Sequence, residues 1–253
     1  MVEKLDNINS IYQLYNDFNW ENYKNLNPYL YIIGLRREEE YIYNYLTEGR
    51  YIGRKYKINN NANNTNNYSF HVLLATVGKD SIFNILSMLK IQLTELDYLT
   101  IVFDGINKSK NINKVKEFTS EFKCSVKIII EEKNLGYWGH GIRNKHNNLE
   151  GDFVYHIDDD DIILDNTFKI IRNICQDKNT IYLFKIMLKN NIIIWKTKNI
   201  KLNEISTQSG IIPTQINKEG YWELKYGGDY NFYKKLSEKH RVLFIDKLIY
   251  KKN

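Results

Sequence analysis

The longer, second part of the chain alternates short apolar runs with amphipathic segments. The apolar runs lie at 70–77 (FHVLLATV), 98–103 (YLTIVF), 125–130 (SVKIII) and 152–157 (DFVYHI). Continuous apolar runs of this length are typical of strands that a parallel sheet buries on both faces. Helices are expected between them, at 82–93 with one apolar stripe, at 113–122 and at 139–149. This alternation predicts an α/β fold with a mostly parallel sheet flanked by helices.

The first part of the chain has a different pattern. Residues 1–57 are rich in Tyr, Leu and Ile at helical spacing, and 37–46 (REEEYIYNYL) begins with acids, as amphipathic helices do. Seven of the nine residues at 59–67 are Asn, so this tract has no apolar side chains to bury and reads as a linker. We therefore predict a small helical module at 1–57, an Asn-rich linker at 58–68 and an α/β domain at 69–253.

Composition narrows the possible partners. The chain has 36 basic and 30 acidic residues, a net charge of +6, and its basic residues form no long block interleaved with aromatic ones. We therefore expect no nucleic-acid partner. The N-terminus lacks a signal-peptide pattern, and no apolar run reaches the about 18 residues that a membrane span needs. These features predict a cytoplasmic protein without a transmembrane segment, in an infected host cell or a virion if the chain is viral.

Acidic and polar residues follow the predicted strands. Asp104 follows the second strand, Asn134 and Gly136 follow the third, and four aspartates at 158–161 follow the fourth. The carboxyl ends of parallel strands share one edge of the sheet, where α/β proteins bind ligands. Adjacent carboxylates repel each other, and Mg²⁺ or Mn²⁺, which prefer oxygen ligands, would relieve the repulsion. Alternate strand residues point the same way, so Asp158 and Asp160 are the candidate ligands. A solvated acidic turn is the alternative.

A glycine-rich turn before the fourth strand offers further candidates. In 135–144 (LGYWGHGIRN), Arg143 and Asn144 lie on a predicted helix, and an arginine near a helix N-terminus can hold phosphate. Trp138 and His140 of the same turn could line a sugar or nucleotide pocket. The alternatives are a surface position for Arg143 and His140 and ordinary packing for Trp138.

Two further aspartates have both a functional and a structural interpretation. Asp104 could accept a hydrogen bond from a base or ribose, but an Asp before Gly is also a common turn former. Asp229, in YGGDYNFYKKL, could be the general base that deprotonates an acceptor hydroxyl. Its position also suits a helix N-cap.

In chain order, these motifs resemble a family-2 glycosyltransferase of the GT-A (Rossmann-like) fold. The resemblance covers about 69–250 and rests on FDG at 103–105, NLG at 134–136, IRN at 142–144, GDFVYHIDDDD at 151–161, which contains a D-x-D motif, and GGDYNFYKKL at 227–236. Residues 17–30 and 46–57 resemble a small helical module that accompanies glycosyltransferases in bacteria and large DNA viruses, with Tyr29 and Ile52 where Asp and Glu are usual.

The resemblance implies a metal-dependent transfer, with inversion, from a nucleoside-diphosphate sugar, foremost a UDP-sugar, to an acceptor hydroxyl. The implied donor-binding residues are Thr76, Asp104, Asn134, Gly136, Arg143, Asn144, Asp158 and Asp159. Asp160 and Asp158 would bind Mn²⁺ or Mg²⁺, and Asp229 would be the base, although Gly228 stands where an acid is usual. Trp138, His140 and Trp222 are candidates for an acceptor pocket. The acceptor (glycan, lipid or protein) and the oligomeric state stay open.

Two other functions remain possible from the sequence. A nucleotidyltransferase also places metal-binding acids on an α/β sheet, but such enzymes often carry a glycine-rich basic loop after the first strand. Here that loop offers only Gly78 and Lys79. A non-catalytic module that binds a nucleotide sugar or a glycan is the other alternative, and Gly228 beside the proposed base favours it.

Overall fold

The computed structural model describes residues 18–27, 29–32, 34–46, 67–107 and 109–253 of the 253-residue chain. Contacts within the chain divide it into two compact units, 1–65 and 66–253, which we call the first and the second unit. Most of the predicted Asn-rich linker lies outside the described residues, and so does the second half of the helical-module motif apart from Leu46. The predicted domain boundaries therefore stay a prediction.

The described part of the first unit consists of short helices around an aromatic cluster. The helices are α2 (Trp20–Leu26), α3 (Tyr29–Ile32) and α4 (Glu38–Asn44). Tyr23 and Tyr41 are fully buried in this cluster, and their rings pack edge to face. The helix that the acidic start at 37–46 predicts is α4, where Glu40 accepts hydrogen bonds from the backbone amides of Arg36 and Arg37.

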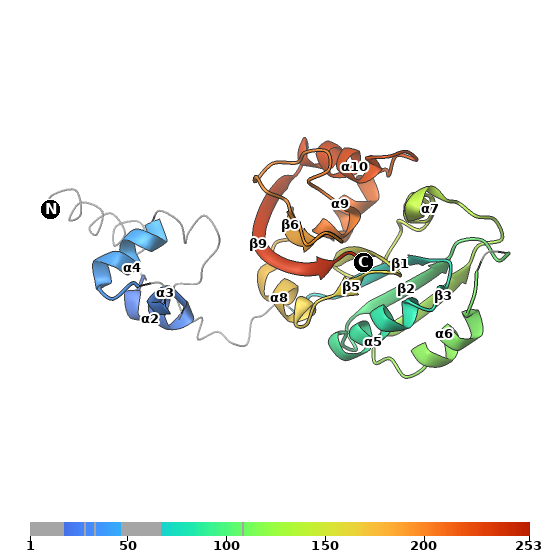
Figure 1. Ribbon diagram of the computed structural model, residues 1–253, viewed down its shortest axis with the longest axis horizontal. Helices are drawn as coiled ribbons and strands as arrows, with labels where there is room; N and C mark the ends of the chain where they lie inside the picture. The colour runs from blue at the N-terminus through green and yellow to red at the C-terminus, as the bar shows by residue number, and fades with distance from the viewer. Residues whose placement is uncertain (1–17, 28, 33, 47–66, 108) are drawn as a thin grey trace. The chain divides into compact units, whose positions relative to one another are not determined.

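The second unit is built on one mixed sheet, which has nine strands within the described residues. The strands are β1 (Phe70–Thr76), β2 (Tyr98–Phe103), β3 (Ser125–Ile130), β4 (Phe153–Asp158), β5 (Ile162–Ile163), β6 (Thr180–Met187), β7 (Ile193–Ile194), β8 (Gly210–Pro213) and β9 (Arg241–Lys251). Their order is β3-β2-β1-β4-β8-β6-β9-β5, and β7 pairs with β6. The long, curved β9 runs beside β6 in Figure 1.

The first four strands are parallel and match the predicted ones to within one residue at each end. Every residue of β1 is buried, as its continuous apolar run predicts. Beyond β4 the pattern changes, because β8 lies antiparallel to both β4 and β6, while β9 is parallel to β6. The predicted α/β fold is confirmed, and the antiparallel strands make the later half of the sheet mixed.

Helices cover both faces of this sheet. They are α5 (Ile82–Gln92), α6 (Ile112–Thr119), α7 (His140–Lys145), α8 (Thr167–Ile174), α9 (Thr214–Glu219) and α10 (Gly228–Ser237). On β1, Val72 and Leu74 pack with the core that includes α5 and α8, while Leu73 and Ala75 pack with α7. A separate core lies between the later strands and helices α9 and α10.

Helix α7 is shorter than the helix predicted at 139–149. Residues 136–139 all have positive φ, between 52° and 81°, which no right-handed helix allows. The helix therefore begins only at His140, after the short turn η2 (Tyr137–Gly139), and ends at Lys145.

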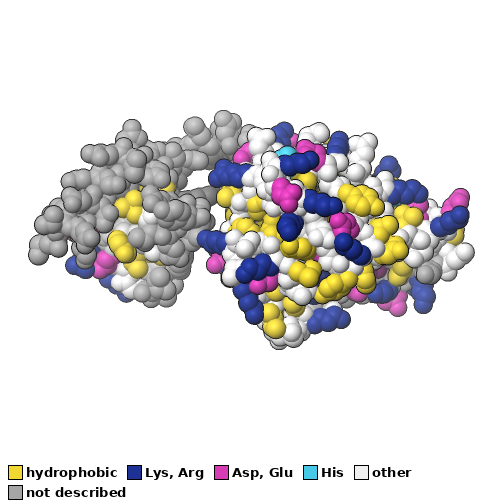
Figure 2. Space-filling view, turned by 90° about the horizontal axis from the view of Figure 1, so that it is seen from above, with side chains coloured by type: hydrophobic (Ala, Val, Ile, Leu, Met, Phe, Trp, Pro, Cys, Tyr) yellow, Lys and Arg dark blue, Asp and Glu magenta, His cyan; other side chains and the backbone are white. Residues whose placement is uncertain are grey.

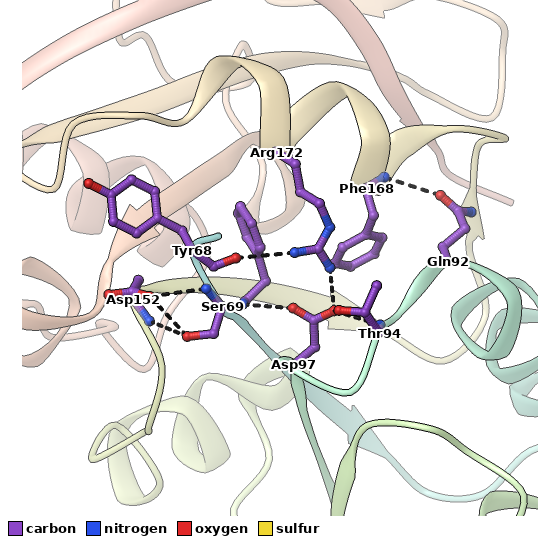
Figure 3. Close-up of polar contacts among 9 residues, drawn as sticks. Tyr68, Ser69, Gln92, Thr94, Asp97, Asp152, Phe168 and Arg172 are labelled. Atoms are coloured by element: carbon purple, nitrogen blue, oxygen red, sulfur yellow. Dashed lines mark hydrogen bonds and ion pairs between the residues drawn. The ribbon is translucent and has the colours of Figure 1, made fainter. Parts of the chain in front are cut away.

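A buried aspartate ties three elements together at the amino edge of the sheet (Figure 3). The Asp97 side chain is fully buried; one oxygen accepts a hydrogen bond from the Phe70 amide (3.0 Å), where β1 begins. The other oxygen accepts hydrogen bonds from the Thr94 amide (2.7 Å) and from Arg172 of α8. Asp97 thereby fixes β1, the turn before β2 and α8 to one another, at the edge opposite the strand ends that carry the predicted site.

The surface of the second unit carries both signs of charge. On the face that Figure 2 shows, Lys and Arg side chains are interspersed with acidic and hydrophobic ones and form no single block. Within the described ranges, no helix combines the length and the apolar character that a membrane crossing requires.

Candidate functional site

Two cavities open where β1 and β4 end. The first, which we call the strand-end cavity, has a volume of about 310 Å³. Six of the predicted donor-binding residues line it: Thr76, Asp104, Asn134, Gly136, Asp158 and Asp159. These residues come from three strand ends and the NLG turn, so the parallel topology brings them together as the sequence predicts.

The second cavity, which we call the loop cavity, has a volume of about 430 Å³. Predicted candidates His140 and Asp229 line it, together with residues of the loops at 202–207 and 225–227. Trp138, Asp158 and Asp160 line both cavities. The two cavities therefore adjoin along a wall formed by these three side chains.

Asp158 is held firmly in that wall. One carboxylate oxygen accepts a hydrogen bond from Arg143 (2.5 Å), and the other accepts one from the side-chain amide of Gln208. Gln208 is fully buried, and its own carbonyl oxygen accepts a hydrogen bond from Ser206 (2.8 Å). Both oxygens thus have a fixed donor, which sets the orientation of the carboxylate.

Arg143 and Asn144 lie behind the wall rather than in a cavity. The Arg143 side chain is 0% exposed and also donates to the backbone carbonyl of Trp138 (2.8 Å). Asn144 exchanges two hydrogen bonds of 2.8 Å with the backbone of Trp222. Sequence analysis expected both residues to contact the donor. In the structure, Arg143 instead supports Asp158, and Asn144 supports the loop before α10.

Asp104 organises the NLG turn while it lines the strand-end cavity. Its carboxylate accepts hydrogen bonds from the amides of Leu135 (2.6 Å) and Gly136 (3.0 Å), and Asn134 donates to its backbone carbonyl (3.1 Å). Asp104 therefore has a structural role, but in the NLG turn rather than in the Asp-Gly turn that the sequence suggested. Each carboxylate oxygen still has a lone pair for a ligand in the cavity.

The other aspartates of the run differ in their surroundings. Asp159 is buried and accepts a hydrogen bond from the Thr76 hydroxyl, and burial raises its pKa. Burial also raises the pKa of Asp161, to about 6, while the Asn253 amide donates to it (3.1 Å). Asp160 is the most open, with 48% of its side chain exposed, and it pairs with Lys79 (3.1 Å). Asp160 is thus the acid of this run best placed to meet a ligand.

His140 and Asp229 face the loop cavity from two elements. His140 is buried, its Nδ1 lies 2.9 Å from the Glu223 carbonyl, and burial together with the Arg143 charge lowers its pKa. A neutral ring that donates from Nδ1 keeps Nε2 as an acceptor. Asp229 lies in the first turn of α10, whose N-cap is Gly227, so Asp229 is not the N-cap residue. A carboxylate in the first turn is favoured by the helix dipole.

The three aromatic candidates divide between surface and core. Trp138 is 70% exposed and lines both cavities. Trp222 is buried, stacks on Phe232 with ring centroids 3.9 Å apart, and is absent from the lining of both cavities. The expected pocket role of Trp222 is therefore replaced by packing beneath His140, whose ring centroid lies 5.5 Å away.

Sequence analysis did not single out three residues of the site. Lys79 was considered only in the loop of the nucleotidyltransferase alternative, although it directly follows the first strand and its glycine turn. Gln208 reaches Asp158 only because the short η3 turn (Thr207–Ser209) lies before β8, and β8 pairs with β4. Tyr226 lines the loop cavity from a loop with no regular pattern. The positions of Gln208 and Tyr226 depend on the long-range pairing of β8 and on the packing of the loops, which the local sequence does not show.

Comparison with models of known protein families gives no match, and comparison with curated proteins gives none either. Solved structures do match. Residues 1–349 of S. aureus TarS align with a TM-score of 0.60 and 22% identity over 73% of this chain and 60% of that one. The same protein in complex with UDP-GlcNAc aligns with a TM-score of 0.58 and 20% identity, over 72% of this chain and 58% of that one.

A third match is the mannosyltransferase PcManGT from Pyrobaculum calidifontis, in complex with GDP-Man and Mn²⁺. It aligns with a TM-score of 0.54 and 12% identity over 72% of this chain and 56% of that one. The chain thus spans no more than three fifths of these structures. Identities this low define the fold alone, and the predicted glycosyltransferase fold is confirmed at that level. The resemblance of the N-terminal residues to a helical module stays a prediction.

Proposed function

We propose that the second unit transfers a sugar from a nucleoside-diphosphate sugar to an acceptor hydroxyl. The observation that carries this proposal is the wall of Trp138, Asp158 and Asp160 between two cavities. A donor in the strand-end cavity and an acceptor in the loop cavity would meet at this wall. Transfer between two bound substrates needs this juxtaposition.

The strand-end cavity suits the nucleotide part of the donor. Asp104 and Asn134 offer acceptors and a donor to a base or ribose, and Lys79 brings a positive charge near the diphosphate position. The structural matches to TarS with UDP-GlcNAc and to PcManGT with GDP-Man support a nucleotide sugar. Following the sequence resemblance, we propose a UDP-sugar as the first donor to test.

The residues present fit a divalent ion that is bound together with the donor. Within the described residues, no group of three or more His, Cys, Asp or Glu side chains could hold a metal. Mg²⁺ and Mn²⁺ sites are commonly completed by one or two carboxylates and substrate phosphates, and the exposed carboxylate of Asp160 suits that arrangement. Sequence analysis also expected Asp158 as a ligand. Each of its oxygens accepts one hydrogen bond and keeps a second lone pair, so we retain Asp158 beside Asp160 as a candidate ligand. Such an ion would neutralise the charge on the departing diphosphate.

In the proposed reaction, the acceptor oxygen attacks the anomeric carbon as the bond to the diphosphate breaks. Asp229, which lines the loop cavity, would take the proton of the acceptor hydroxyl. A single displacement of this kind inverts the anomeric centre. Arg143 and Gln208 do not take part directly; they keep Asp158 in a fixed orientation beside the reacting groups.

The test is product analysis with purified chain. The chain is incubated with UDP-, GDP- and TDP-sugars, Mn²⁺ and mixed glycan acceptors, and released nucleotides are identified. We expect release of a nucleoside diphosphate, strongly reduced in Asp160→Asn and unchanged in Asp165→Asn, an exposed control outside both cavities. Release of pyrophosphate instead would favour a nucleotidyltransferase. Donor binding without any turnover would favour the non-catalytic module.

A further inference from the structure

Two exposed aromatic side chains line the loop cavity. Trp138 and Tyr226 are each 70% exposed, and among the large hydrophobic side chains of the described residues only Ile91 is more exposed, at 74%. Large aromatic side chains are usually buried, because each removes considerable apolar area from water when it packs. Their exposure in the same cavity is therefore a feature that packing does not explain.

The backbone of Trp138 adds a second, independent observation. Its φ is 52°, and Tyr137 before it has a φ of 55°. Such a conformation costs a bulky residue about 1–3 kcal/mol; it persists only where the surrounding structure holds it, and such residues cluster at active sites and ligand sites. Arg143 fixes this turn through the Trp138 carbonyl (2.8 Å) and also holds Asp158. The position of the exposed indole is thus tied to the wall between the two cavities.

The rest of the loop cavity is rich in hydrogen-bonding groups. Asn203, Thr207, Asp229 and Asn253 line it, and Asn203 also accepts a hydrogen bond from the Tyr226 hydroxyl (2.5 Å). A sugar ring has an apolar C–H face that stacks on an aromatic ring and a rim of hydroxyls that need polar partners. Aromatic surfaces combined with side-chain amides and carboxylates match both requirements.

Other acceptor classes fit this lining less well. A lipid tail would need a continuous apolar surface, but Leu202 and Ile205 are the only aliphatic side chains in the described lining. A polyanion would meet four aspartates against three lysines, a lining with no net positive charge. The volume of about 430 Å³ falls within the roughly 300–1,000 Å³ of small-molecule sites, which suits one or two sugar units.

From this geometry we infer that the loop cavity binds a saccharide and that the acceptor of the proposed transfer is therefore a glycan. Trp138 and Tyr226 supply the stacking surfaces, and Asp229 lies within reach of the same cavity. The saccharide site stands on its own observations, whereas its role as the acceptor site rests on the proposed function.

The test is saccharide binding by ligand-observed NMR, with and without UDP and Mn²⁺. The probes are methyl glycosides of glucose, galactose, mannose and N-acetylglucosamine, with maltose, lactose and chitobiose. We expect at least one to bind the wild type and to bind Trp138→Ala and Tyr226→Ala about tenfold or more weakly. Matched controls are Tyr137→Ala, from the same turn, and Tyr221→Ala; both side chains are exposed and line neither cavity. The controls should bind as the wild type does.

Nucleotide-sugar binding, followed separately by thermal shift, distinguishes this inference from the proposed function. Tyr226 lines only the loop cavity, so Tyr226→Ala should keep the wild-type thermal shift, which also shows that it is folded. If no probe binds, or if both variants bind as well as their controls, the inference is overturned even where transfer to a lipid or peptide is seen. If saccharide binding depends on both aromatics but no nucleotide sugar binds, the saccharide site stands and the proposed function fails.

Discussion

Replacing Arg143 by Met separates a supporting role from direct donor binding. The guanidinium is 0% exposed, pairs with Asp158 at 2.5 Å and donates to the Trp138 carbonyl. Breaking a buried pair by removing one partner costs about 3–5 kcal/mol. Asp158 is 27% exposed, so water can reach it after the change, and we expect the low end, about 3 kcal/mol. For a unit of this size, each kcal/mol lowers Tm by about 2–4 °C.

We therefore expect Arg143→Met to lower Tm by about 6–12 °C, measured by calorimetry without ligand. The same loss should appear with and without a nucleotide sugar, because Arg143 lines neither cavity. Lys169→Met is the control, since Lys169 is exposed on α8 and lines neither cavity. A variant with wild-type Tm that has lost nucleotide binding would refute the reasoning and return Arg143 to the donor-binding role.

Three further predictions follow from other parts of the second unit. Asp229→Asn should lower turnover by about 10²–10⁴-fold while donor binding, followed by thermal shift, is kept; unchanged turnover would exclude Asp229 as the base. Asp97→Ala should destabilise the protein by about 3–5 kcal/mol in urea unfolding, because it leaves Arg172 without its buried partner; a loss below about 1 kcal/mol would contradict the anchoring role. Burial lowers the pKa of His156 to about 3, so stability should fall as pH drops below 6.5, where the unfolded chain takes up the proton. His156→Phe should weaken the dependence of Tm on pH without abolishing it, because His71 and His140 keep their own lowered pKa values. An unchanged dependence would count against the role of His156.

The parallel half of the fold was predictable because its signals are local. Runs such as 98–103 and 125–130 are continuous, apolar and bounded by turns, and the structure has these strands at the same residues. Strands β5 and β7 have two residues each, too short for any periodicity. Strand β5 forms only by pairing with β9, which is distant in the sequence, and β7 forms only by pairing with β6.

The candidate site was predictable where it lies at strand ends. Asp104 and Asp158 line the strand-end cavity because parallel strands end at one edge. Arg143 and Trp222 were expected at the surface of a pocket, but both are buried. Sequence patterns give the residue type and the element, but burial of a polar or aromatic side chain depends on which loops pack over it. The hydrogen bond from Gln208 to Asp158 likewise depends on loop packing.

The most direct measurement is the thermal stability of the chain with UDP, GDP and their sugars, each with and without Mn²⁺. A ligand that binds the native state raises Tm by mass action. At a ligand concentration a hundredfold above Kd, the free energy of unfolding rises by about 2.7 kcal/mol. The account predicts a shift with at least one of these nucleotides that requires Mn²⁺ and is lost in Asp160→Asn. No shift with any nucleoside diphosphate, or an equal shift without Mn²⁺ and in Asp160→Asn, would contradict it.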